Sequence, residues 1–479
     1  MEVQEVSRVQ SPTAQQVVAD LIKRARAAQA GFAKLGQQGM DDAVAAVGWA
    51  IMEPGRNRLL AELAVQETGL GNVEDKVTKN HRKTLGLLRD LKRVRTHGAI
   101  AESKSTGITE FARPVGVVAA ITPSTNPGAT PANNIINALK CGNAVIVAPS
   151  PKGLAVSQML LNFIHAELSK CSLPIDLVQV LPAPISKALT AELMQQADLV
   201  IATGSQANVR MAYTCGTPAF GVGAGNVASI VDSSADVKQA ASLIVASKTF
   251  DNATSCSSEN SMVVLDEVRD AMLQAMRDLG GLLLSSQEKE RLQALMWHHG
   301  KLSDTVTGKS ARHIAELAGI DWRGRIALEA PTVLLVEEHG IGSEHPFSGE
   351  KLSPVLAVYG AQGFNDACAT VQKIYGYMGA GHSVSLHSAD EEQALYLAQN
   401  LPVARVILNQ AHCFATGGNF NNGLPFSLSM GCGTWGGNNF SDNLNYRFYM
   451  NVTRVARTIA ENKPTVEDLL GDYFRRWGV

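Results

Sequence analysis

Residues 142–170 read GNAVIVAPSPKGLAVSQMLLNFIHAELSK, and this stretch contains the two patterns that decide the fold. Asn143–Ala148 is a short, almost continuous apolar run, as is typical of a buried strand. The residues near 153–170 then carry apolar side chains at helical spacing. A strand followed directly by a helix is the repeating unit of a parallel sheet that has helices on both faces.

The same alternation continues along the chain. Strand-like runs lie at Leu177–Leu181, Leu199–Thr203 and Ala228–Val231, and helical stretches lie near 186–196, 206–215 and 236–248. Beyond Cys256 the alternation restarts, with strand candidates at Ser261–Leu265, Thr332–Val336, Val355–Tyr359 and Val403–Asn409. A chain of 479 residues is long enough for two large domains. The sequence therefore predicts a doubly wound α/β fold in two lobes, with the boundary close to Cys256.

Helices are expected before the first sheet. Ser11-Pro12 precedes one apolar face made by Val18, Leu21, Ile22, Ala25, Phe32 and Leu35, which predicts a long helix, and residues 41–95 continue as helices. An amphipathic tag for a partner is the alternative, but no flexible linker follows, so packing against the body is favoured. Residues 97–115 alternate around Ser105-Thr106-Gly107, which predicts a hairpin, an arm that reaches a second subunit.

Composition excludes several classes of function. The net charge is −2, with 42 basic and 44 acidic side chains, so there is no general electrostatic case for binding nucleic acid or an anionic membrane. No apolar stretch is long enough to span a bilayer, and no N-terminal signal sequence is visible. The seven cysteines are scattered and show no Cys-x-x-Cys pair, so no metal site is predicted. We expect reduced thiols and a cytoplasmic protein.

Two positions are candidates for catalysis. Cys256 lies in the polar stretch TSCSSE, where a thiol can meet solvent and ionise; a surface thiol in a loop is the alternative. Asn126 lies in the turn PSTNPG, directly after a strand candidate at Val115–Ile121. Sites in α/β proteins form at such carboxyl ends of strands, and the Asn126 amide could donate to an oxyanion. Asn beside Pro and Gly is also common in turns that have no other role.

Two glycine-containing bends are candidates for binding phosphate. Thr203-Gly204-Ser205 lies between a strand and a helix, where backbone N–H groups and the helix dipole can meet a pyrophosphate. Residues 221–226 read GVGAGN and form a second bend. Neither has the complete dinucleotide fingerprint, so each could also be an ordinary glycine turn.

Taken together and in order, these segments resemble the aldehyde dehydrogenase superfamily, and specifically its coenzyme-A-acylating branch. The superfamily has a PWNxP-like turn, a GNxVxxxPS strand, a TGS turn, an ELGG segment, a catalytic Cys and an E-x-x-x-P motif. The corresponding segments here are PSTNP (123–127), GNAVIVAPS (142–150), TGS (203–205), GVGAGN (221–226), TSCSSEN (254–260) and EKLSPV (350–355).

The resemblance implies a role for each matching residue. Cys256 corresponds to the nucleophile, Asn126 to the oxyanion donor and Glu350 to the carboxylate that holds the nicotinamide ribose. The other residues implied to bind the cofactor are Ser150, Lys152, Thr203, Gly204, Ser205, Gly223 and Gly225. The implied fold is two Rossmann-like α/β lobes with a β-hairpin oligomerisation arm, and the implied assembly is a homodimer or homotetramer.

The resemblance also divides the chain into domains. The expected parts are an NAD(P)-binding domain at 1–96 and 116–254, an oligomerisation arm at 97–115 and 440–460, a catalytic domain at 255–439 and a C-terminal extension at 461–479.

Two departures from the hydrolytic relatives are informative. Val222 stands where those relatives carry the general-base Glu, so a thioester on Cys256 would hydrolyse slowly, whereas the more acidic thiol of coenzyme A can attack it. Ala148 and Pro151 stand where they carry a Lys and the Glu that binds the adenosine ribose. Lys152 beside Ser150 would instead favour a 2′-phosphate, so NADP is preferred to NAD. Lys152 could equally serve the 3′-phosphate of coenzyme A or be a solvated residue at a helix start.

The aldehyde is inferred from similarity within the branch. The segments NQAHCFATGGNFNNG (409–423) and GCGTWGGN (431–438) resemble enzymes for succinate semialdehyde and sulfoacetaldehyde more than those for acetaldehyde. A small anionic aldehyde is therefore expected, with sulfoacetaldehyde favoured. Donors in the first segment that could bind its anion are Asn409, His412, Thr416 and Asn419. The alternatives are an enzyme that does not need coenzyme A and a catalytically idle binding subunit.

Overall fold

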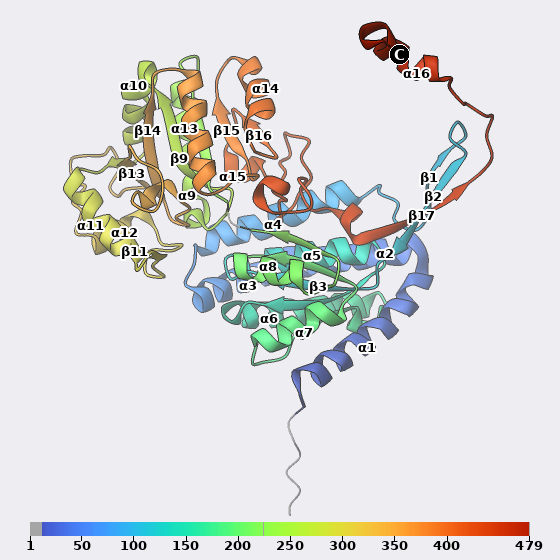
Figure 1. Ribbon diagram of the computed structural model, residues 1–479. Helices are drawn as coiled ribbons and strands as arrows, with labels where there is room; N and C mark the ends of the chain where they lie inside the picture. The colour runs from blue at the N-terminus through green and yellow to red at the C-terminus, as the bar shows by residue number, and fades with distance from the viewer. Residues whose placement is uncertain (1–11, 224, 479) are drawn as a thin grey trace, which may run out of the picture.

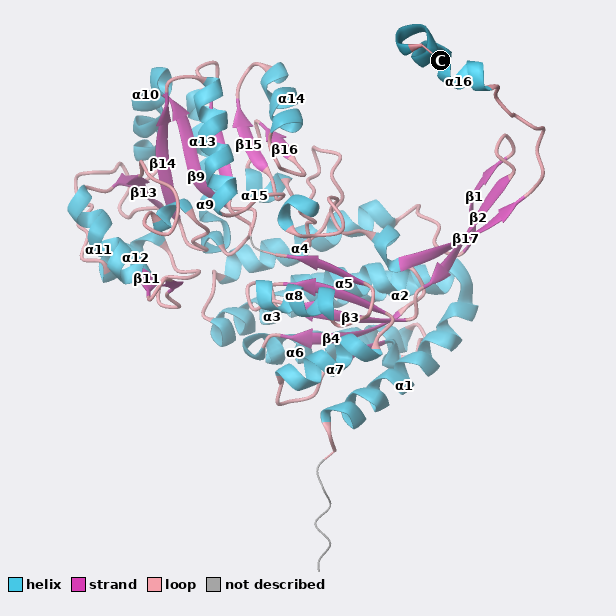
Figure 2. Cartoon of the chain, viewed as in Figure 1, coloured by secondary structure: helices cyan, strands magenta, loops and turns pink. Residues whose placement is uncertain are grey.

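The computed structural model describes residues 12–223 and 225–478, which form two α/β lobes and a projecting arm (Figure 1). Each lobe is built on a parallel sheet flanked by helices (Figure 2). This architecture confirms the predicted fold class.

The first lobe contains a five-stranded parallel sheet in the order β5-β4-β3-β6-β7. Its strands are β3 (Val117–Thr122), β4 (Ala144–Pro149), β5 (Val178–Val180), β6 (Leu199–Thr203) and β7 (Ala219–Val222). Every residue of β3 and β4 is buried, as their continuous apolar runs require. The helices between the strands are α5 (Ala129–Lys140), α6 (Leu154–Lys170), α7 (Lys187–Gln196) and α8 (Gln206–Thr214).

Four helices precede this sheet: α1 (Ala14–Phe32), α2 (Gly36–Met52), α3 (Pro54–Thr68) and α4 (Val73–Leu91). Helix α1 packs against β3 and β4, whereas α2, α3 and α4 pack against α5 and α6. Helix α1 is capped by Thr13, whose side chain accepts from the Gln16 backbone N–H while the Gln16 side chain accepts from the Thr13 N–H. Of the predicted start Ser11-Pro12, Ser11 lies outside the described residues. The apolar face of α1 is buried in the core of the first lobe, so the predicted packing is confirmed.

The second lobe contains a seven-stranded parallel sheet in the order β10-β13-β14-β9-β8-β15-β16. Its strands are β8 (Val227–Val231), β9 (Glu259–Leu265), β10 (Gly281–Leu283), β13 (Val333–Glu337), β14 (Val355–Ala361), β15 (Val384–His387) and β16 (Val406–Leu408). Its helices are α9 (Val237–Thr249), α10 (Asp266–Asp278), α11 (Ser286–Met296), α12 (Ala311–Leu317), α13 (Phe364–Tyr377), α14 (Glu391–Asn400) and α15 (His412–Ala415). A short hairpin of β11 (Trp297–His298) and β12 (Lys301–Leu302) lies outside this sheet.

The predicted lobe boundary near 254 is wrong. Strand β8 pairs with β9 and β15 of the second sheet, so the chain changes lobe between residues 222 and 227. A fully buried apolar strand such as β8 fits the middle of either sheet, and only its pairing partners distinguish them. The predicted end of the catalytic domain at 439 is also wrong, because Phe426 already packs in the core of the first lobe.

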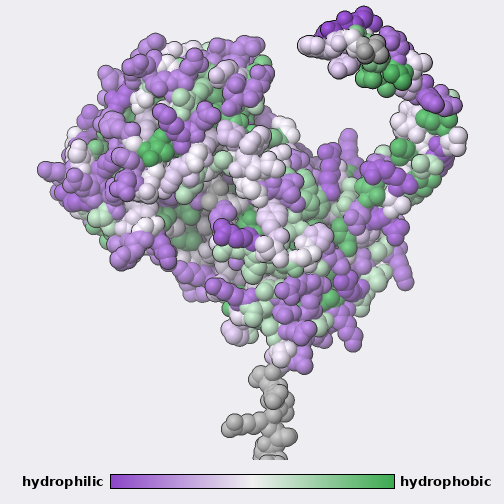
Figure 3. All heavy atoms as spheres, in the orientation of Figure 1, coloured by the Kyte–Doolittle hydropathy of each residue, from purple (hydrophilic) through white to green (hydrophobic). Residues whose placement is uncertain are grey.

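The predicted hairpin is confirmed as β1 (Gly98–Ser103) and β2 (Ile108–Pro114). Strand β17 (Met450–Ala456) pairs antiparallel with β2 and completes a three-stranded sheet. This arm leads to helix α16 (Val466–Trp477), which stands away from both lobes and carries exposed apolar side chains (Figures 1 and 3). Within the part of the chain that the structure describes, no helix has the length and apolar composition needed to cross a bilayer.

Candidate active site

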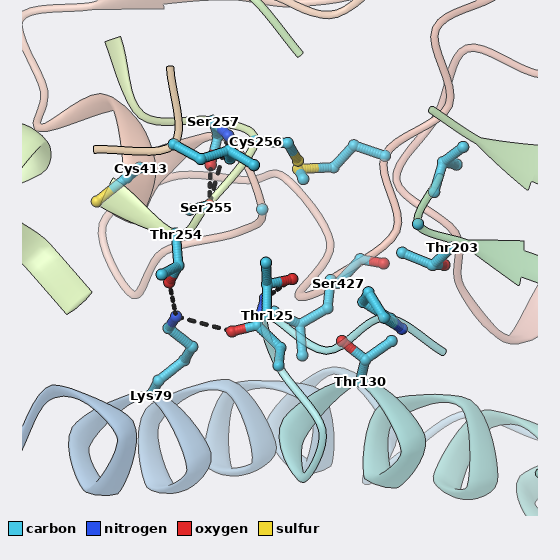
Figure 4. Close-up of a pocket in the computed structure, with 18 of the residues that line it drawn as sticks. Lys79, Thr125, Thr130, Thr203, Thr254, Ser255, Cys256, Ser257, Cys413 and Ser427 are labelled. Atoms are coloured by element: carbon cyan, nitrogen blue, oxygen red, sulfur yellow. Dashed lines mark hydrogen bonds between the residues drawn. The ribbon is translucent and has the colours of Figure 1, made fainter. Parts of the chain in front are cut away.

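A cavity of about 300 Å³ lies between the lobes and collects most of the predicted catalytic residues (Figure 4). The first lobe contributes α4, the turn after β3 and the segment after β6. The second contributes the loop before β9, the segment around Glu350 and part of α15. The cavity therefore lies at the carboxyl ends of β3 and β6, where α/β proteins form sites.

Cys256 lies in the loop that leads into β9. The preceding residues Asp251, Asn252 and Ala253 all have positive φ values, and the buried Asp251 carboxylate anchors their turn. Asp251 Oδ2 accepts from Lys76 Nζ at 3.0 Å, from Thr254 Oγ1 at 2.7 Å and from Lys79 Nζ. This network between α4 and the loop fixes the direction in which Cys256 enters the cavity.

The polar neighbours of Cys256 do not solvate its thiol, contrary to prediction. The Ser255 and Ser257 hydroxyl groups bond to each other at 2.8 Å, and the Thr254 hydroxyl bonds to Asp251. Burial, followed by the nearby Glu350 carboxylate, raises the pKa of Cys256 to about 12. The nucleophile must therefore gain positive charge around it before it ionises.

Asn126 is held so that its amide nitrogen is free to donate. Lys79 Nζ lies 2.8 Å from Asn126 Oδ1, and an ammonium group can only donate. The oxygen of the amide is therefore engaged on the α4 side. The Nδ2 group makes only a long contact of 3.5 Å with Thr125 Oγ1, so it can turn toward an oxyanion formed at Cys256.

Glu350 is the single carboxylate among the described residues that line the cavity. Burial raises its pKa to about 8, although the backbone of Gly225 and the charge of Lys248 partly oppose this shift. Val222 also lines the cavity and carries no proton-accepting group. At position 222 the cavity therefore has no carboxylate that could activate a water molecule for hydrolysis of a thioester.

Both glycine-containing bends contribute to the cavity. Thr203, Gly204, Ser205 and Gly223 line it, and Ser205 caps α8 by accepting from the Asn208 backbone N–H. A helix N-terminus behind a short turn fits a pyrophosphate. Gly225 is not in the lining; a Cβ atom there would lie 2.1 Å from the Cys256 carbonyl oxygen. Its role is therefore to let the bend pack directly against the nucleophile loop.

Ser150 and Lys152 lie outside the cavity lining. Ser150 Oγ is buried and has no hydrogen-bond partner among the described residues, so it could donate to a bound ribose or phosphate. Lys152 Nζ lies 3.4 Å from Asp304 Oδ2 of the second lobe, and both side chains are largely exposed. Such a surface ion pair is weak, so Lys152 remains available to an anionic ligand.

The structure does not bring the four predicted substrate donors into the cavity. Asn409 bonds to both backbone groups of Ser388. His412 is buried, its Nδ1 lies 2.7 Å from the Ser257 carbonyl oxygen, and burial lowers its pKa to about 4. Thr416 Oγ1 donates to the His412 carbonyl oxygen, and Asn419 Oδ1 accepts from Arg82. These polar groups are used to fold their own loop and do not line this cavity, so their binding of the substrate anion stays a prediction.

Three basic side chains of α4 line the cavity and were not predicted: Lys79, Arg82 and Lys83. The segment KVTKNHRK (76–83) places Lys76, Lys79 and Lys83 on one helical face, which was the available signal. Such a run usually indicates a solvated surface. Burial of Lys76, Lys79 and Lys83 shows that this face instead points into the protein.

Comparisons with known proteins agree with this geometry. The model of the aldehyde dehydrogenase family matches residues 2–426. The chain is 67% identical over 465 residues to the sulfoacetaldehyde dehydrogenase (acylating) of Cupriavidus necator, covering 97% of this chain and 94% of that protein. It is 36% identical to the succinate-semialdehyde dehydrogenase (acetylating) of Clostridium kluyveri, covering 95% and 99%. The crystal structure of an acetylating aldehyde dehydrogenase from Geobacillus thermoglucosidasius superposes with a TM-score of 0.89 at 34% identity, covering 94% of this chain and 98% of that one.

Proposed function

The chain belongs to the aldehyde dehydrogenase family, in its CoA-acylating branch, and on this premise we propose that it oxidises sulfoacetaldehyde to the corresponding acyl-CoA with NADP as the hydride acceptor. The aldehyde is proposed from the relative that is 67% identical. The observation that carries the acylating reaction is the cavity itself, which combines Cys256 and Asn126 with a valine at position 222. Succinate semialdehyde is the second candidate, because the related acetylating enzyme is 36% identical.

The proposed chemistry begins at Cys256. Its Sγ atom attacks the aldehyde carbon, and the thiol proton leaves to solvent. The resulting oxyanion is stabilised by Asn126 Nδ2 and the Cys256 backbone N–H. The hydride of this adduct would pass to a nicotinamide cofactor, which Glu350 and the segment 203–205 would hold. A thioester then remains on Cys256.

Transfer to coenzyme A completes the reaction. The thiolate of coenzyme A attacks the thioester carbon, and Cys256 leaves as a thiolate. Water competes poorly because the cavity offers it no carboxylate at position 222 and because a thiol is ionised far more than water near neutral pH. This transfer step is reversible, since a thioester is exchanged for a thioester.

The reaction class can be tested by NAD(P)H absorbance with sulfoacetaldehyde, succinate semialdehyde and acetaldehyde, each with and without coenzyme A. We expect reduction that depends on coenzyme A, with sulfoacetaldehyde giving the highest kcat/KM and Cys256→Ala giving no activity. Equal rates without coenzyme A would contradict the acyl transfer. Activity that survives in Cys256→Ala would contradict the nucleophile. A higher kcat/KM for succinate semialdehyde than for sulfoacetaldehyde would identify succinate semialdehyde as the substrate instead.

NADP is proposed over NAD because of the residues that follow β4. The segment APSPK (148–152) has no acid for a ribose 2′-hydroxyl but carries the exposed Lys152 and the unpaired Ser150 hydroxyl. We expect Lys152→Ala to lower the ratio of kcat/KM for NADP to that for NAD by about tenfold. Lys187→Ala, at another exposed lysine of the same lobe, is the control and should leave the ratio unchanged. An unaltered ratio in Lys152→Ala would contradict the proposed role of Lys152 in the preference for NADP.

We also propose a homodimer or homotetramer in which the arm formed by β1, β2 and β17 contacts another subunit. The support is that the arm projects from the lobes with its strands largely exposed. A cytoplasmic location is proposed because all seven cysteines are free thiols, and Cys256 and Cys413 line the cavity.

We further propose that the first lobe binds NAD(P) and that the second lobe carries the nucleophile.

A further inference from the structure

Helix α4 presents two kinds of basic side chain to the centre of the protein, and they differ in how their charge is balanced. Lys76 and Lys79 both form ion pairs with the buried Asp251 carboxylate. Arg82 and Lys83, one turn further along the helix, have no carboxylate within ion-pairing distance among the described residues. Burying an unbalanced charge is costly, so these two cations need an anion from outside the chain.

Lys83 is buried at the wall of the cavity. Its Nζ donates to the Gly417 carbonyl oxygen at 2.7 Å and lies 5.6 Å from the centre of the Phe426 ring. An ammonium group has three donors, so at least one remains for a ligand in the cavity that Lys83 lines. Burial, together with the charges of Arg82 and Lys79, lowers the pKa of Lys83 to about 7. The position therefore lacks the negative charge that would keep a lysine fully protonated.

Arg82 lies among aromatic rings. Its guanidinium carbon lies 5.1 Å from the centre of the Phe414 ring and 5.6 Å from that of Phe426. The Nη2 group donates to the Phe414 carbonyl oxygen at 3.2 Å and to Asn419 Oδ1. The described residues accept nothing from Nε or Nη1, and the side chain lines both the cavity and a shallower neighbouring pocket. A rigid guanidinium with free donors suits a tetrahedral or planar oxyanion group.

We propose that Arg82 and Lys83 bind the anionic end of the aldehyde substrate, a sulfonate in the proposed reaction, and thereby select anionic aldehydes over neutral ones. This inference rests on the proposed function, because it assigns the recognition of that substrate. Asn126, Cys256, Arg82 and Lys83 all line the same cavity of about 300 Å³. A two-carbon aldehyde can therefore place its carbonyl at the thiol while its sulfonate meets the two cations.

The proposal is tested with Arg82→Gln, Lys83→Met and the control Arg89→Gln. Arg89 lies two turns further along α4, and its guanidinium covers the same Phe420 and Phe426 rings. It differs in being paired with Asp90 and largely exposed. The control thus removes an arginine from the same aromatic cluster without touching the cavity.

We expect kcat/KM for sulfoacetaldehyde to fall by about 30-fold or more in Arg82→Gln and in Lys83→Met, and kcat/KM for propionaldehyde to change by less than about threefold. Arg89→Gln should change neither value. Equal losses for both aldehydes would overturn the proposal, because they would indicate a disturbed site rather than a lost anion contact. A rise in KM for coenzyme A with no change for the aldehyde would also overturn it and assign the cations to a phosphate of coenzyme A.

A binding measurement separates this proposal from the reaction itself. Ethanesulfonate carries the anion without an aldehyde, so its calorimetric affinity does not depend on turnover. We expect it to bind the wild-type enzyme and to bind both cavity variants at least about tenfold more weakly. If the wild-type enzyme binds ethanesulfonate in this way but does not oxidise sulfoacetaldehyde, the proposed function fails while the anion site stands. Equal binding by wild type and both variants would refute the anion site.

Discussion

At the scale of single residues, burial determines the pKa values of the ionisable side chains in the cavity. The same desolvation that raises the pKa of Cys256 to about 12 and that of Glu350 to about 8 lowers the pKa of Lys83 to about 7. A bound anion therefore decides whether Lys83 is charged at neutral pH. A bound oxidised nicotinamide would supply positive charge to the cavity and so favour ionisation of the thiol.

The titration of Lys83 predicts a pH dependence of anion binding. Because its pKa in the free enzyme is about 7, Lys83 is protonated below that pH and loses its charge as the pH rises above it. The affinity for ethanesulfonate should therefore be highest below pH 7 and should fall by up to about tenfold per pH unit above it, until the anion binds through Arg82 alone. Calorimetry between pH 6 and 9 measures this profile.

Other groups around Lys83 must be separated from it. Arg82 and Lys79 on α4, Cys413 on α15 and Cys256 all face it. Burial keeps both thiols neutral below pH 9, with pKa values of about 12. Glu350 titrates near pH 8 and would also repel an anion at high pH. The Lys83→Met variant retains Glu350, so a profile as steep in this variant as in wild type would assign the dependence to Glu350 instead.

At the scale of secondary-structure elements, buried strands were predictable and their partners were not. β3 and β4 were evident from continuous apolar runs, whereas β10 and β15 were not located. β8 was located but assigned to the wrong sheet, because pairing is a long-range property.

The candidate site also contains residues that the sequence made predictable and residues that it did not. Cys256, Asn126, Glu350 and Thr203–Ser205 were predictable because each lies in a short ordered motif at the end of an element. The substrate-binding role of Asn409, His412, Thr416 and Asn419 stays a prediction, because polar side chains that fold a loop have the same composition as those that bind a ligand. Arg82 and Lys83 were missed, because sequence cannot distinguish a solvated basic helical face from one enclosed by a second lobe.

At the scale of the whole molecule, the arm and α16 leave apolar surface without a cover. Val466, Leu469, Leu470, Tyr473 and Trp477 of α16 are all exposed. A helix of 12 residues is marginal in water without packing. We therefore expect the proposed assembly to cover this apolar surface and to stabilise the arm and its helix.

We expect light scattering to give a mass of two or four times 50.9 kDa for the wild-type protein. Proline at both Val452 and Thr453 removes the N–H groups of adjacent β17 residues, one of which faces β2, and should shift the mass toward the monomer. Arg454→Ala, which removes only an exposed ion pair with Glu110, should leave the mass unchanged. A monomeric wild-type protein would refute the assembly.

The return of the chain from the second lobe to the first has a consequence for the order of folding during synthesis. All five strands of the first sheet are complete at residue 222, yet its core also contains Phe426, Phe440, Leu444 and Tyr449. The Tyr449 carbonyl oxygen further accepts from Asn143 Nδ2, next to β4. During synthesis, the core of the first lobe therefore stays incomplete and partly exposed until the ribosome has made the whole second lobe. The first lobe to be translated is the last to be closed.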